Sequence, residues 1–580
     1  MGNVRTILRS VRDNKKATIL ALVFIVGESF LETLIPYITA LLVNRIRNGI
    51  DMDYILKMGG VMVLAAFASL ACGVLAGMFS AKASAGVARN LRADVFAKIQ
   101  SFSFANVDKF STSSLVTRTT TDITNVQNSY MMCIRIAVRA PMMLIFSIVM
   151  ASIMGGQLAL TFAVIIPVLA FGLIMIARKA MPAFIAVFRK YDKLNESIEE
   201  NVRGMRVVKG FAREDYEIKK FSGASEDIMK DFTKAERIVA LNSPLMQFCL
   251  YFNMLFVLLI GSKLVITSGG ASIDVGQMSA MITYGVQVLM SLMMISMIYV
   301  MLTMSLESMK RLAEVLNETP TISNPDNPVM EVADGSIDFT DVHFKYSEHA
   351  EREALFDIDL HIDSGMTVGV LGGTGSSKST FVQLIPRLYD VTSGSVKVGG
   401  VDVREYDIRV LRDAVSVVLQ KNVLFAGTIS ENLRWGNENA TQEQIEEACR
   451  LAQADEFIRS FEKGYDTHIE QGGTNVSGGQ KQRLCIARAL LKQPKILILD
   501  DSTSAVDMKT DALIRKGFKE FIPDTTKIII AQRVASVMDA DMIVILDGGK
   551  IVATGTHDEL LKSSQIYREI YEQQTKGGLE

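Results

Sequence analysis

The hydrophobic residues of this chain are gathered into long stretches in its first half. Each stretch is close to the ~20 apolar residues that a helix needs to cross a bilayer. The six stretches are Ala17–Val43, Gly59–Ala81, Ala137–Met154, Ala159–Ala177, Leu245–Ile266 and Met278–Met304. The pattern therefore predicts an all-α membrane domain of six transmembrane helices.

The polar segments between these stretches indicate the orientation of the chain in the membrane. Lys82–Tyr130 and Arg189–Asn242 are long, carry both signs of charge and have helical periodicity, whereas the other connections are short. Ahead of the first stretch, Val4–Arg12 interleaves apolar residues with arginines, which predicts an amphipathic helix on the cytoplasmic membrane surface. Because positive charge favours the cytoplasmic side, we expect the N-terminus and both long segments there.

The second half of the chain has a different pattern. Residues 319–335 contain Pro320, Pro325 and Pro328, and after them short apolar runs alternate with amphipathic stretches. Such alternation is typical of an α/β domain. The chain is expected to comprise a membrane domain at 1–318, a linker at 319–335 and a cytoplasmic α/β domain at 336–580.

Composition agrees with two unlike halves and removes some classes of function. The 580 residues are 49% hydrophobic and 21% charged, which is too apolar for an ordinary soluble enzyme. The formal net charge of −2 gives no sign of a nucleic-acid partner. The five cysteines are scattered without pairing or metal-ligand spacing, so neither disulfides nor a structural metal is expected.

A glycine-rich turn in the second half carries the clearest chemistry. The sequence LGGTGSSKST follows the apolar strand Thr367–Leu371 and precedes an apolar helix. Backbone amides in such a turn hold phosphate oxygens, while Lys378 is placed to neutralise the outer phosphates and Ser379 to bind Mg²⁺. We therefore expect ATP and Mg²⁺ as cofactors. The predicted phosphate site comprises Gly372, Gly373, Thr374, Gly375, Ser376, Ser377, Lys378, Ser379 and Thr380.

Two sets of side chains in the membrane half are candidates for binding substrate. Glu28 and Glu32 lie one helical turn apart in the first span, where a charge costs at least ~2.5 kcal/mol. They either line a cavity for cationic ligands or pair with Arg135 or Arg139 of the third span. A stripe of methionines in the sixth span forms either a flexible wall for varied ligands or ordinary packing. The stripe consists of Met290, Met294, Met297, Met301 and Met304.

A second phosphate-binding element follows later in the chain. The sequence NVSGGQKQR at Asn475–Arg483 opens a helix, so its serine and glycine amides form another helix-start anion site. After it, the apolar strand KILILD ends in Asp500. This order of motifs resembles the nucleotide-binding domain of ABC transporters. In that family two domains meet head to tail, and each nucleotide lies between one partner's phosphate loop and the other's signature. The matching signature residues are Ser477, Gly478, Gly479 and Gln480.

The resemblance implies roles for further residues. Tyr346 matches the aromatic that stacks on adenine, and Gln420 matches the glutamine that contacts Mg²⁺ and couples to the membrane part. Asp500 matches the aspartate that holds the metal, so Ser379, Gln420 and Asp500 are the expected metal-binding residues. Asp507 ends the run SAVD at Ser504–Asp507, which matches the loop that crosses the dimer interface.

The layout of the whole chain resembles an ABC exporter half-transporter, in which six spans precede one nucleotide-binding domain. In that family, helices of the long cytoplasmic loops press on the nucleotide-binding domains, and Ser114–Val126 and Asn201–Tyr216 match them. The resemblance implies a multi-pass protein of a bacterial plasma membrane with a cytoplasmic nucleotide-binding domain. Its expected substrates are lipids or amphipathic, multidrug-type compounds, moved outward across the lipid bilayer.

Three substitutions affect the hydrolytic centre of that family. Asp501 stands where hydrolytic members carry the glutamate that orients the attacking water, so its carboxylate is one methylene shorter. Gln532 replaces the switch histidine, and an amide cannot carry a proton charge near neutral pH. Ser377 replaces a glycine, and its Cβ is unfavourable if this position requires an unusual φ. All three belong to the site on this chain's own phosphate loop.

This asymmetry predicts a heterodimer, because the signature is intact while the chain's own catalytic positions, Asp501 and Gln532, are degenerate. The partner is expected to be a homologous half-transporter with the catalytic glutamate and the switch histidine. Alternatives are a homodimer with weak ATPase activity, a peptide or bacteriocin exporter, and a nucleotide-gated regulatory or channel-like protein.

Overall fold

The computed structural model describes all residues except 1, 48–51, 269–272, 348–349, 502–505 and 577–580. These residues form two compact units. The first comprises residues 1–100 and 111–318, and the second comprises residues 101–110 and 319–580. The second unit therefore includes a short segment from the first long polar stretch.

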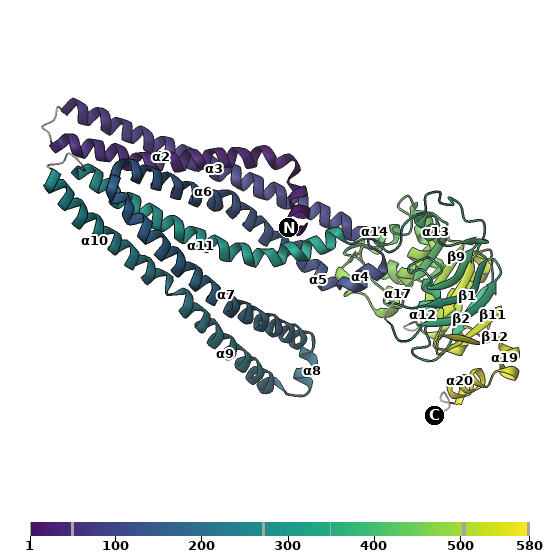
Figure 1. The fold of residues 1–580 in the computed structure, drawn as a ribbon. Coiled ribbons are helices and arrows are strands. Elements are labelled where there is room, and N and C mark those ends of the chain that lie inside the picture. Colours follow the sequence, from purple (N-terminus) through teal and green to yellow (C-terminus); the bar gives the residue numbers. More distant parts are fainter. Residues whose placement is uncertain (1, 48–51, 269–272, 348–349, 502–505, 577–580) are drawn as a thin grey trace. The chain divides into compact units, whose positions relative to one another are not determined.

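The first unit consists of helices (Figure 1). Within its described part, five continuous helical segments are long and apolar enough to cross a membrane. The third of them, Thr112–Arg203, contains both α6 and α7, which meet at Gly156 with a φ of +46°. The α-helices are α1 (Gly2–Leu8), α2 (Lys15–Arg47), α3 (Met52–Gln100), α5 (Thr112–Thr117), α6 (Ile123–Gly155), α7 (Leu160–Arg203), α8 (Met205–Gly210), α9 (Glu214–Val239), α10 (Asn242–Ser268) and α11 (Val275–Asn317). Between them lie η1 (Arg9–Asn14), η2 (Arg118–Asp122) and η3 (Gly156–Ala159).

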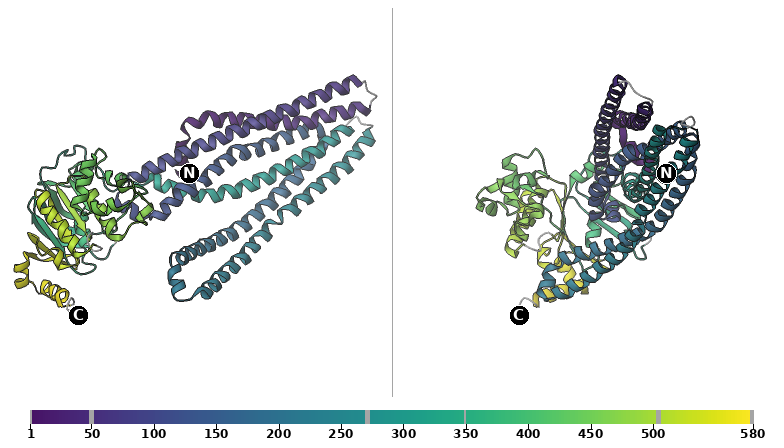
Figure 2. Two further views of the ribbon diagram at one scale, coloured as in Figure 1. Left: turned by 180° about the vertical axis from the view of Figure 1, so that it is seen from behind. Right: turned by 90° about the vertical axis from the view of Figure 1, so that its left-hand side faces the viewer.

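The long polar segments of the sequence are continuations of membrane helices. α3 has 49 residues and α7 has 44, which is about twice what a bilayer requires. The polar part of α7 runs beside α9, and α8 joins them at the tip of this hairpin (Figures 1 and 2). The expected helical periodicity is therefore present, within helices that extend beyond the apolar stretches.

The N-terminal segment is helical, as its periodicity predicted, but it packs against protein. The helical path bends at Arg12, which has a φ of +36°. Asp94 of α3 accepts hydrogen bonds from the Ser10 hydroxyl at 2.7 Å and from the Arg12 guanidinium at 2.9 Å. Ile7 and Val11 are buried, so one side of the segment belongs to the core of the first unit.

The second unit is an α/β domain with a six-stranded, a four-stranded and a two-stranded sheet. The six-stranded sheet has the order β12-β11-β3-β10-β9-β6, and the four-stranded sheet the order β2-β1-β4-β5. The strands are β1 (Ile337–Phe344), β2 (Leu355–Ile362), β3 (Thr367–Leu371), β4 (Ser393–Val398), β5 (Val401–Asp402), β6 (Val415–Val418), β7 (Gly427–Thr428), β8 (His468–Ile469), β9 (Ile496–Asp500), β10 (Thr526–Ile530), β11 (Met542–Asp547) and β12 (Lys550–Gly555).

Helices cover this domain. One of them, α4, comes from the first half of the chain. The α-helices are α4 (Phe104–Phe110), α12 (Lys378–Gln383), α13 (Ile408–Ala414), α14 (Ile429–Arg434), α15 (Gln442–Leu451), α16 (Asp455–Ser460), α17 (Gly478–Leu490), α18 (Met508–Phe521), α19 (His557–Ser563) and α20 (Gln565–Lys576). The short 3₁₀ helices are η4 (Gly464–Asp466), η5 (Gln471–Gly473) and η6 (Val534–Ser536).

The six-stranded sheet separates two hydrophobic cores. Ile496 and Ile498 of β9 pack into the core shared with the four-stranded sheet, whereas Leu497 and Leu499 pack into the core formed with α15, α17 and α18. This period of two is what a strand buried on both faces requires, and it explains the continuous apolar run before Asp500.

The parallel pairing of this sheet brings three loops to one edge. β10 pairs in parallel with β3 and with β9, so that Ile530 lies opposite both Val370 and Asp500. The segments that follow β3, β9 and β10 therefore emerge next to one another. In open parallel sheets this carboxyl edge is where ligands bind.

The helix α4 lies in the first long polar stretch but packs within the second unit. The segment 101–110 packs within the second unit, whereas Ser114–Val126 belongs to the first unit and pairs with α11 through Asp122 and Arg311. The Asn106 side chain donates to the Thr319 carbonyl, and Asp108 accepts from the Tyr389 hydroxyl at 2.7 Å. The expectation that Ser114–Val126 presses on a nucleotide-binding domain stays a prediction. The corresponding expectation for Asn201–Tyr216 stays a prediction.

Candidate nucleotide-binding site

The glycine-rich turn after β3 is shaped to receive phosphate. Gly373, Thr374 and Gly375 form its exposed tip, and a Cβ on either glycine would meet no atom within 4 Å. Gly372 is crowded instead, because a Cβ there would lie 2.1 Å from the Leu546 carbonyl oxygen. Ser377 has a φ of +67°, the left-handed conformation that its replacement of glycine made a concern. The turn thus keeps its shape at a local cost in strain.

Lys378, the first residue of α12, is held over this turn. Its ammonium group donates to the carbonyls of Gly372 and Gly373, both at 2.8 Å, and lies 3.3 Å from the Ser376 hydroxyl. Burial lowers the pKa of Lys378, while the nearby carboxylates of Asp500 and Asp501 oppose that shift. A half-buried ammonium that contacts only neutral carbonyls and a hydroxyl is well suited to accept an anionic group as its partner.

The end of β9 places two carboxylates next to α12. The Ser379 hydroxyl donates to the Asp500 carboxylate at 3.1 Å, which brings together two of the three expected metal-binding residues. Thr380, one residue further, shares a hydrogen bond with the Tyr346 hydroxyl. Burial raises the pKa of Asp500, and the neighbouring Asp501 raises it further. A hydroxyl and a carboxylate at this distance offer the oxygen ligands that Mg²⁺ prefers, so the residues fit that ion.

Asp501 is held by two neutral amides. Its carboxylate oxygen Oδ2 accepts from Gln532 Nε2 at 2.7 Å and from Gln420 Nε2 at 3.4 Å. Burial raises the pKa of Asp501, and these two hydrogen bonds lower it in part. Asp501 also has a φ of +48°. The structure thus joins the two substituted positions, Asp501 and Gln532, by a direct hydrogen bond, and Gln420 completes the group.

The loop that carries Gln532 is fixed by a residue that the sequence analysis missed. The Gln574 side chain of α20 donates to the Gln532 carbonyl and accepts from the Val534 amide, each at 2.8 Å. One side chain therefore holds the backbone on both sides of Arg533. A single glutamine far along the chain has no pattern that predicts such a contact.

The expected adenine-stacking aromatic lies at the end of β1. Tyr346 is half exposed, and its hydroxyl is 2.8 Å from the Thr380 hydroxyl. The rings of Phe344 and Tyr389 meet it edge to face, with centroids 4.8 Å and 5.3 Å away. These contacts orient the Tyr346 ring and tie it to the helix that carries the phosphate turn.

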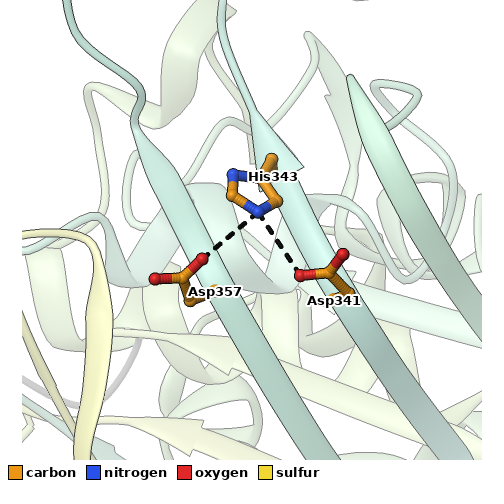
Figure 3. A group of neighbouring side chains, drawn as sticks. All are labelled: Asp341, His343 and Asp357. Carbon is orange, nitrogen blue, oxygen red and sulfur yellow. Dashed lines mark ion pairs between the residues drawn. The ribbon is translucent and has the colours of Figure 1, made fainter.

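A group of charged side chains supports β1, the strand that leads to Tyr346 (Figure 3). His343 Nδ1 is 2.8 Å from the Glu353 carboxylate, and Nε2 is 3.4 Å from both Asp341 and Asp357. The hydrogen bond to Glu353 is the main cause that raises the pKa of His343. Lys550 pairs with Asp357 on the other side. The group cross-links β1, β2 and β12 through ion pairs that favour a protonated imidazole.

The signature residues begin α17. The Ser477 hydroxyl accepts from the Gln480 amide, while the Gln480 side chain accepts from the Ser477 amide at 2.9 Å, so the two form a capping box. Between them, Gly478 is exposed and Gly479 is half-buried. Within the described residues, no hydrogen bond joins these four residues to the phosphate turn. The helix start is therefore preformed and available to a ligand from outside this chain.

Asp507 caps another helix. Its carboxylate accepts from the Thr510 amide at 3.0 Å at the start of α18, and this bond lowers its pKa. Of the run Ser504–Asp507, the first two residues lie outside the described residues.

The candidate substrate residues of the membrane half fall into two groups. Arg139 of α6 donates to Glu28 at 2.9 Å and to Glu32 at 2.7 Å, which is the pairing that the sequence analysis left open. The methionine stripe has a different environment. Met290, Met294 and Met297 are exposed, Met301 is half-buried, and the side chain of Met304 lies outside the described part.

One α/β domain carries a phosphate turn, an acid placed to bind a metal and a helix-start signature, and a bundle of apolar helices precedes it in the chain. This combination defines an ATP-binding membrane transporter subunit. Comparison with protein families agrees. Residues 18–292 match the ABC transporter transmembrane region, and residues 355–504 match the ABC transporter family. The chain belongs to the ABC transporter family.

Similar proteins cover nearly the whole chain. The ABC transporter ATP-binding protein YfiB of Bacillus subtilis is 36% identical over 558 residues, 96% of either chain. The fatty acid ABC transporter ATP-binding/permease protein of Mycobacterium bovis is 32% identical over 477 residues, 82% of this chain and 75% of that protein. The structure of a bacterial Atm1-family ABC exporter with ATP bound has a TM-score of 0.83 at 24% identity, covering 97% of this chain and 98% of that one.

These findings confirm the predicted fold class. An ABC transporter transmembrane region with the fold of an ABC exporter is fused to a C-terminal ABC nucleotide-binding domain of the ATPase type, in a membrane protein whose nucleotide-binding domain is cytoplasmic.

Proposed function

We propose that this chain is the degenerate-site subunit of a heterodimeric ATP-driven exporter in a bacterial plasma membrane. The observation that carries this proposal is the hydrogen bond from Gln532 to Asp501. It places an amide and a shortened carboxylate, rather than an imidazole and a glutamate, beside the phosphate turn. In this proposal the chain's own site binds ATP tightly, and most hydrolysis takes place at the partner's site.

Binding of ATP with Mg²⁺ is supported by the residues of the turn. ATP supplies the phosphoryl transfer that drives such a pump. In this chain, Lys378 would hold the outer phosphates, Ser379 and Asp500 the metal, and Tyr346 the base. Gln420 would contact the metal from the side of Asp501. The open tip at Gly373 and Gly375 allows backbone amides to approach the phosphates closely.

Slow hydrolysis at this site follows from the chemistry of Asp501 and Gln532. A general base contributes ~10²–10⁴-fold to a rate when it is correctly placed, and a shift near 1 Å forfeits much of that gain. The aspartate side chain is shorter than glutamate by one methylene. Gln532 and Gln420 donate to it as neutral amides, and neither amide can change its charge as the reaction proceeds.

The signature would complete the hydrolytic site of the partner. Its capping box between Ser477 and Gln480 fixes the start of α17, where Gly478 is exposed. The partner would be a homologous half-transporter with an intact catalytic glutamate and switch histidine. Asp507 would lie at the interface between the two nucleotide-binding domains. ATP binding would close these domains, and hydrolysis at the partner's site would reopen them.

The proposed substrates are lipids or amphipathic, multidrug-type compounds. Exposed methionines at Met290, Met294 and Met297 offer flexible apolar contacts on α11. One relative carries a name that assigns it fatty acids. Glu28 and Glu32 together carry one more charge than Arg139 neutralises, which leaves them as candidates for a cationic group of a substrate.

The decisive experiment compares ATP turnover by the purified chain alone with turnover by the chain and its partner, both in lipid nanodiscs. We expect tight ATP binding with very slow hydrolysis for the chain alone, and rapid hydrolysis for the pair. Rapid hydrolysis by the chain alone would overturn the proposal and would favour an active homodimer.

A further inference from the structure

The helices α7 and α11 enclose an apolar groove that ends at an arginine. Its membrane-side part is a hollow of about 360 Å³ lined by Leu173, Ile174, Leu292 and Ile295, with Arg178 at one end. This volume is within the range of small-molecule sites. The two helices belong to the same unit and diverge along their length (Figure 1). The walls are therefore mainly apolar, with Ser296 and Tyr299 as their polar members, and the end is cationic.

A second hollow continues the groove towards the polar end of α7. It has a volume of about 460 Å³, shares Ala177, Arg178 and Tyr299 with the first, and reaches Arg189. Ala170 of the first hollow and Arg189 of the second are 19 residues apart on one helix, or about 28 Å at 1.5 Å per residue. The groove is therefore long enough for a single extended acyl chain.

Arg178 and Arg189 line this groove without an acidic partner among the described residues. Neither Arg178 nor Arg189 forms an ion pair or a hydrogen bond with any residue that the structure describes. This differs from Arg139, which both Glu28 and Glu32 neutralise. In addition, Pro182 lacks the amide that would bond to the Arg178 carbonyl in a regular helix. Arg178 thus presents an uncompensated positive charge at a weakened turn of α7.

The position of Arg178 along the helix matches a membrane interface. It directly follows the apolar stretch Ala159–Ala177, on the side that leads to the cytoplasmic part of α7. Tyr299 lies opposite on α11, and tyrosine is enriched where one end of a side chain is apolar and the other is wet. A head group at Arg178 would therefore lie at the inner surface, with its tail directed into the bilayer along Leu173 and Leu292.

We propose that this groove binds a single-chain lipid with an anionic head, a long-chain fatty acid anion, whose carboxylate pairs with Arg178. A guanidinium pairs well with a planar carboxylate, and the groove supplies an apolar wall for one acyl chain. This inference rests on the proposed function and names a substrate class for it. Entry from the inner leaflet follows from the position of Arg178.

Binding of radiolabelled oleate to the full chain in phosphatidylcholine nanodiscs tests the proposal. Arg178→Gln is expected to weaken oleate binding about tenfold, and Arg178→Lys to restore part of it. The control is Lys179→Gln, which removes the adjacent exposed charge that does not line the groove and leaves affinity unchanged. Monoolein, which has the same chain with a neutral head, is expected to compete poorly.

A second variant tests the groove independently of charge. Ile295→Trp fills the hollow and is expected to weaken oleate binding while the protein still binds ATP. Equal oleate binding by Arg178→Gln and wild type would overturn the inference, as would equal competition by monoolein. Neither result depends on ATP turnover, so failure of the lipid site is distinguishable from failure of the proposed heterodimer.

Discussion

The phosphate turn and the signature are two anion-binding ends of one domain, and they differ in what surrounds them. At the signature, Ser477 and Gln480 satisfy each other and leave Gly478 between them exposed. At the phosphate turn, the backbone geometry is equally complete, but Asp501 is bound by Gln532 and Gln420. The comparison teaches that two ends of one domain can share a preformed backbone and still differ in the side chains placed beside it.

The largest expected effect is a loss of ATP hydrolysis when the signature is changed. Gly479→Asp places a carboxylate where phosphate oxygens would meet the start of α17, so that charge repulsion replaces amide donation. In the complex with the partner, we expect ATP hydrolysis to fall at least ~10²-fold. Steady-state phosphate release measures this.

Lys378→Ala, made in the same complex, is the matched change at the other end. It is expected to remove nucleotide from this chain's own site while turnover by the complex changes only a few-fold. The opposite ranking, with Lys378→Ala the more harmful, would contradict the assignment of the two ends.

Restoring the catalytic groups should give the next largest effect. The double variant Asp501→Glu, Gln532→His returns a longer carboxylate and an imidazole, and we expect hydrolysis by the chain's own site to rise ~10²-fold. Single-turnover measurements on the chain alone isolate this site. The two single variants serve as controls and should each give less. An unchanged rate in the double variant would show that other features, such as the strained Ser377, limit the site.

Loosening the segment after β10 should have a moderate effect. Gln574→Ala removes two hydrogen bonds to the backbone around Gln532, each worth about 0.5–1.5 kcal/mol. We expect ATP binding at this chain's own site to weaken several-fold, as measured by equilibrium titration of the chain alone. The exposed neighbour gives the control Gln573→Ala, which should bind ATP like the wild type. Equal affinities for Gln574→Ala and wild type would show that α20 does not position this segment.

The smallest expected effect concerns pH. Burial raises the pKa of Asp501 above the usual 3.8, so the ionised carboxylate destabilises the nucleotide-free fold at neutral pH. Asp501→Asn should therefore raise the melting temperature by a few degrees at pH 8. The gain should shrink as pH falls through the raised pKa and vanish below the unfolded value, because the wild-type carboxyl is then protonated in both states. Thermal denaturation at several pH values measures it, and a gain that persists at low pH would contradict this cause.

Local motifs were predictable from the sequence, and long-range contacts were not. The phosphate turn follows from residues adjacent in the chain, and the φ of Ser377 is the one that a replaced glycine suggested. The capping of α17 by Ser477 has the same local origin. The contact of Gln574 with the segment after β10 joins residues about forty positions apart and leaves no periodic trace.

The membrane half shows the same limit. The lengths of the apolar stretches predicted the helices, because bilayer thickness sets that length. Which charges pair across helices depends on rotation and packing, so Glu28 and Glu32 could be noticed while their partner stayed undecided between Arg135 and Arg139. Arg178 was overlooked, since one arginine after an apolar stretch is an ordinary membrane flank until its neighbours on α11 are known.

The side chain of Tyr389 links Tyr346, the expected adenine-contacting residue, to the helix α4. The Tyr389 ring packs edge to face with the rings of Tyr346 and Phe104, and its hydroxyl donates a hydrogen bond to Asp108. Within the second unit, a nucleotide that moved Tyr346 would therefore also affect α4, the short segment that lies in the chain between α3 and α5.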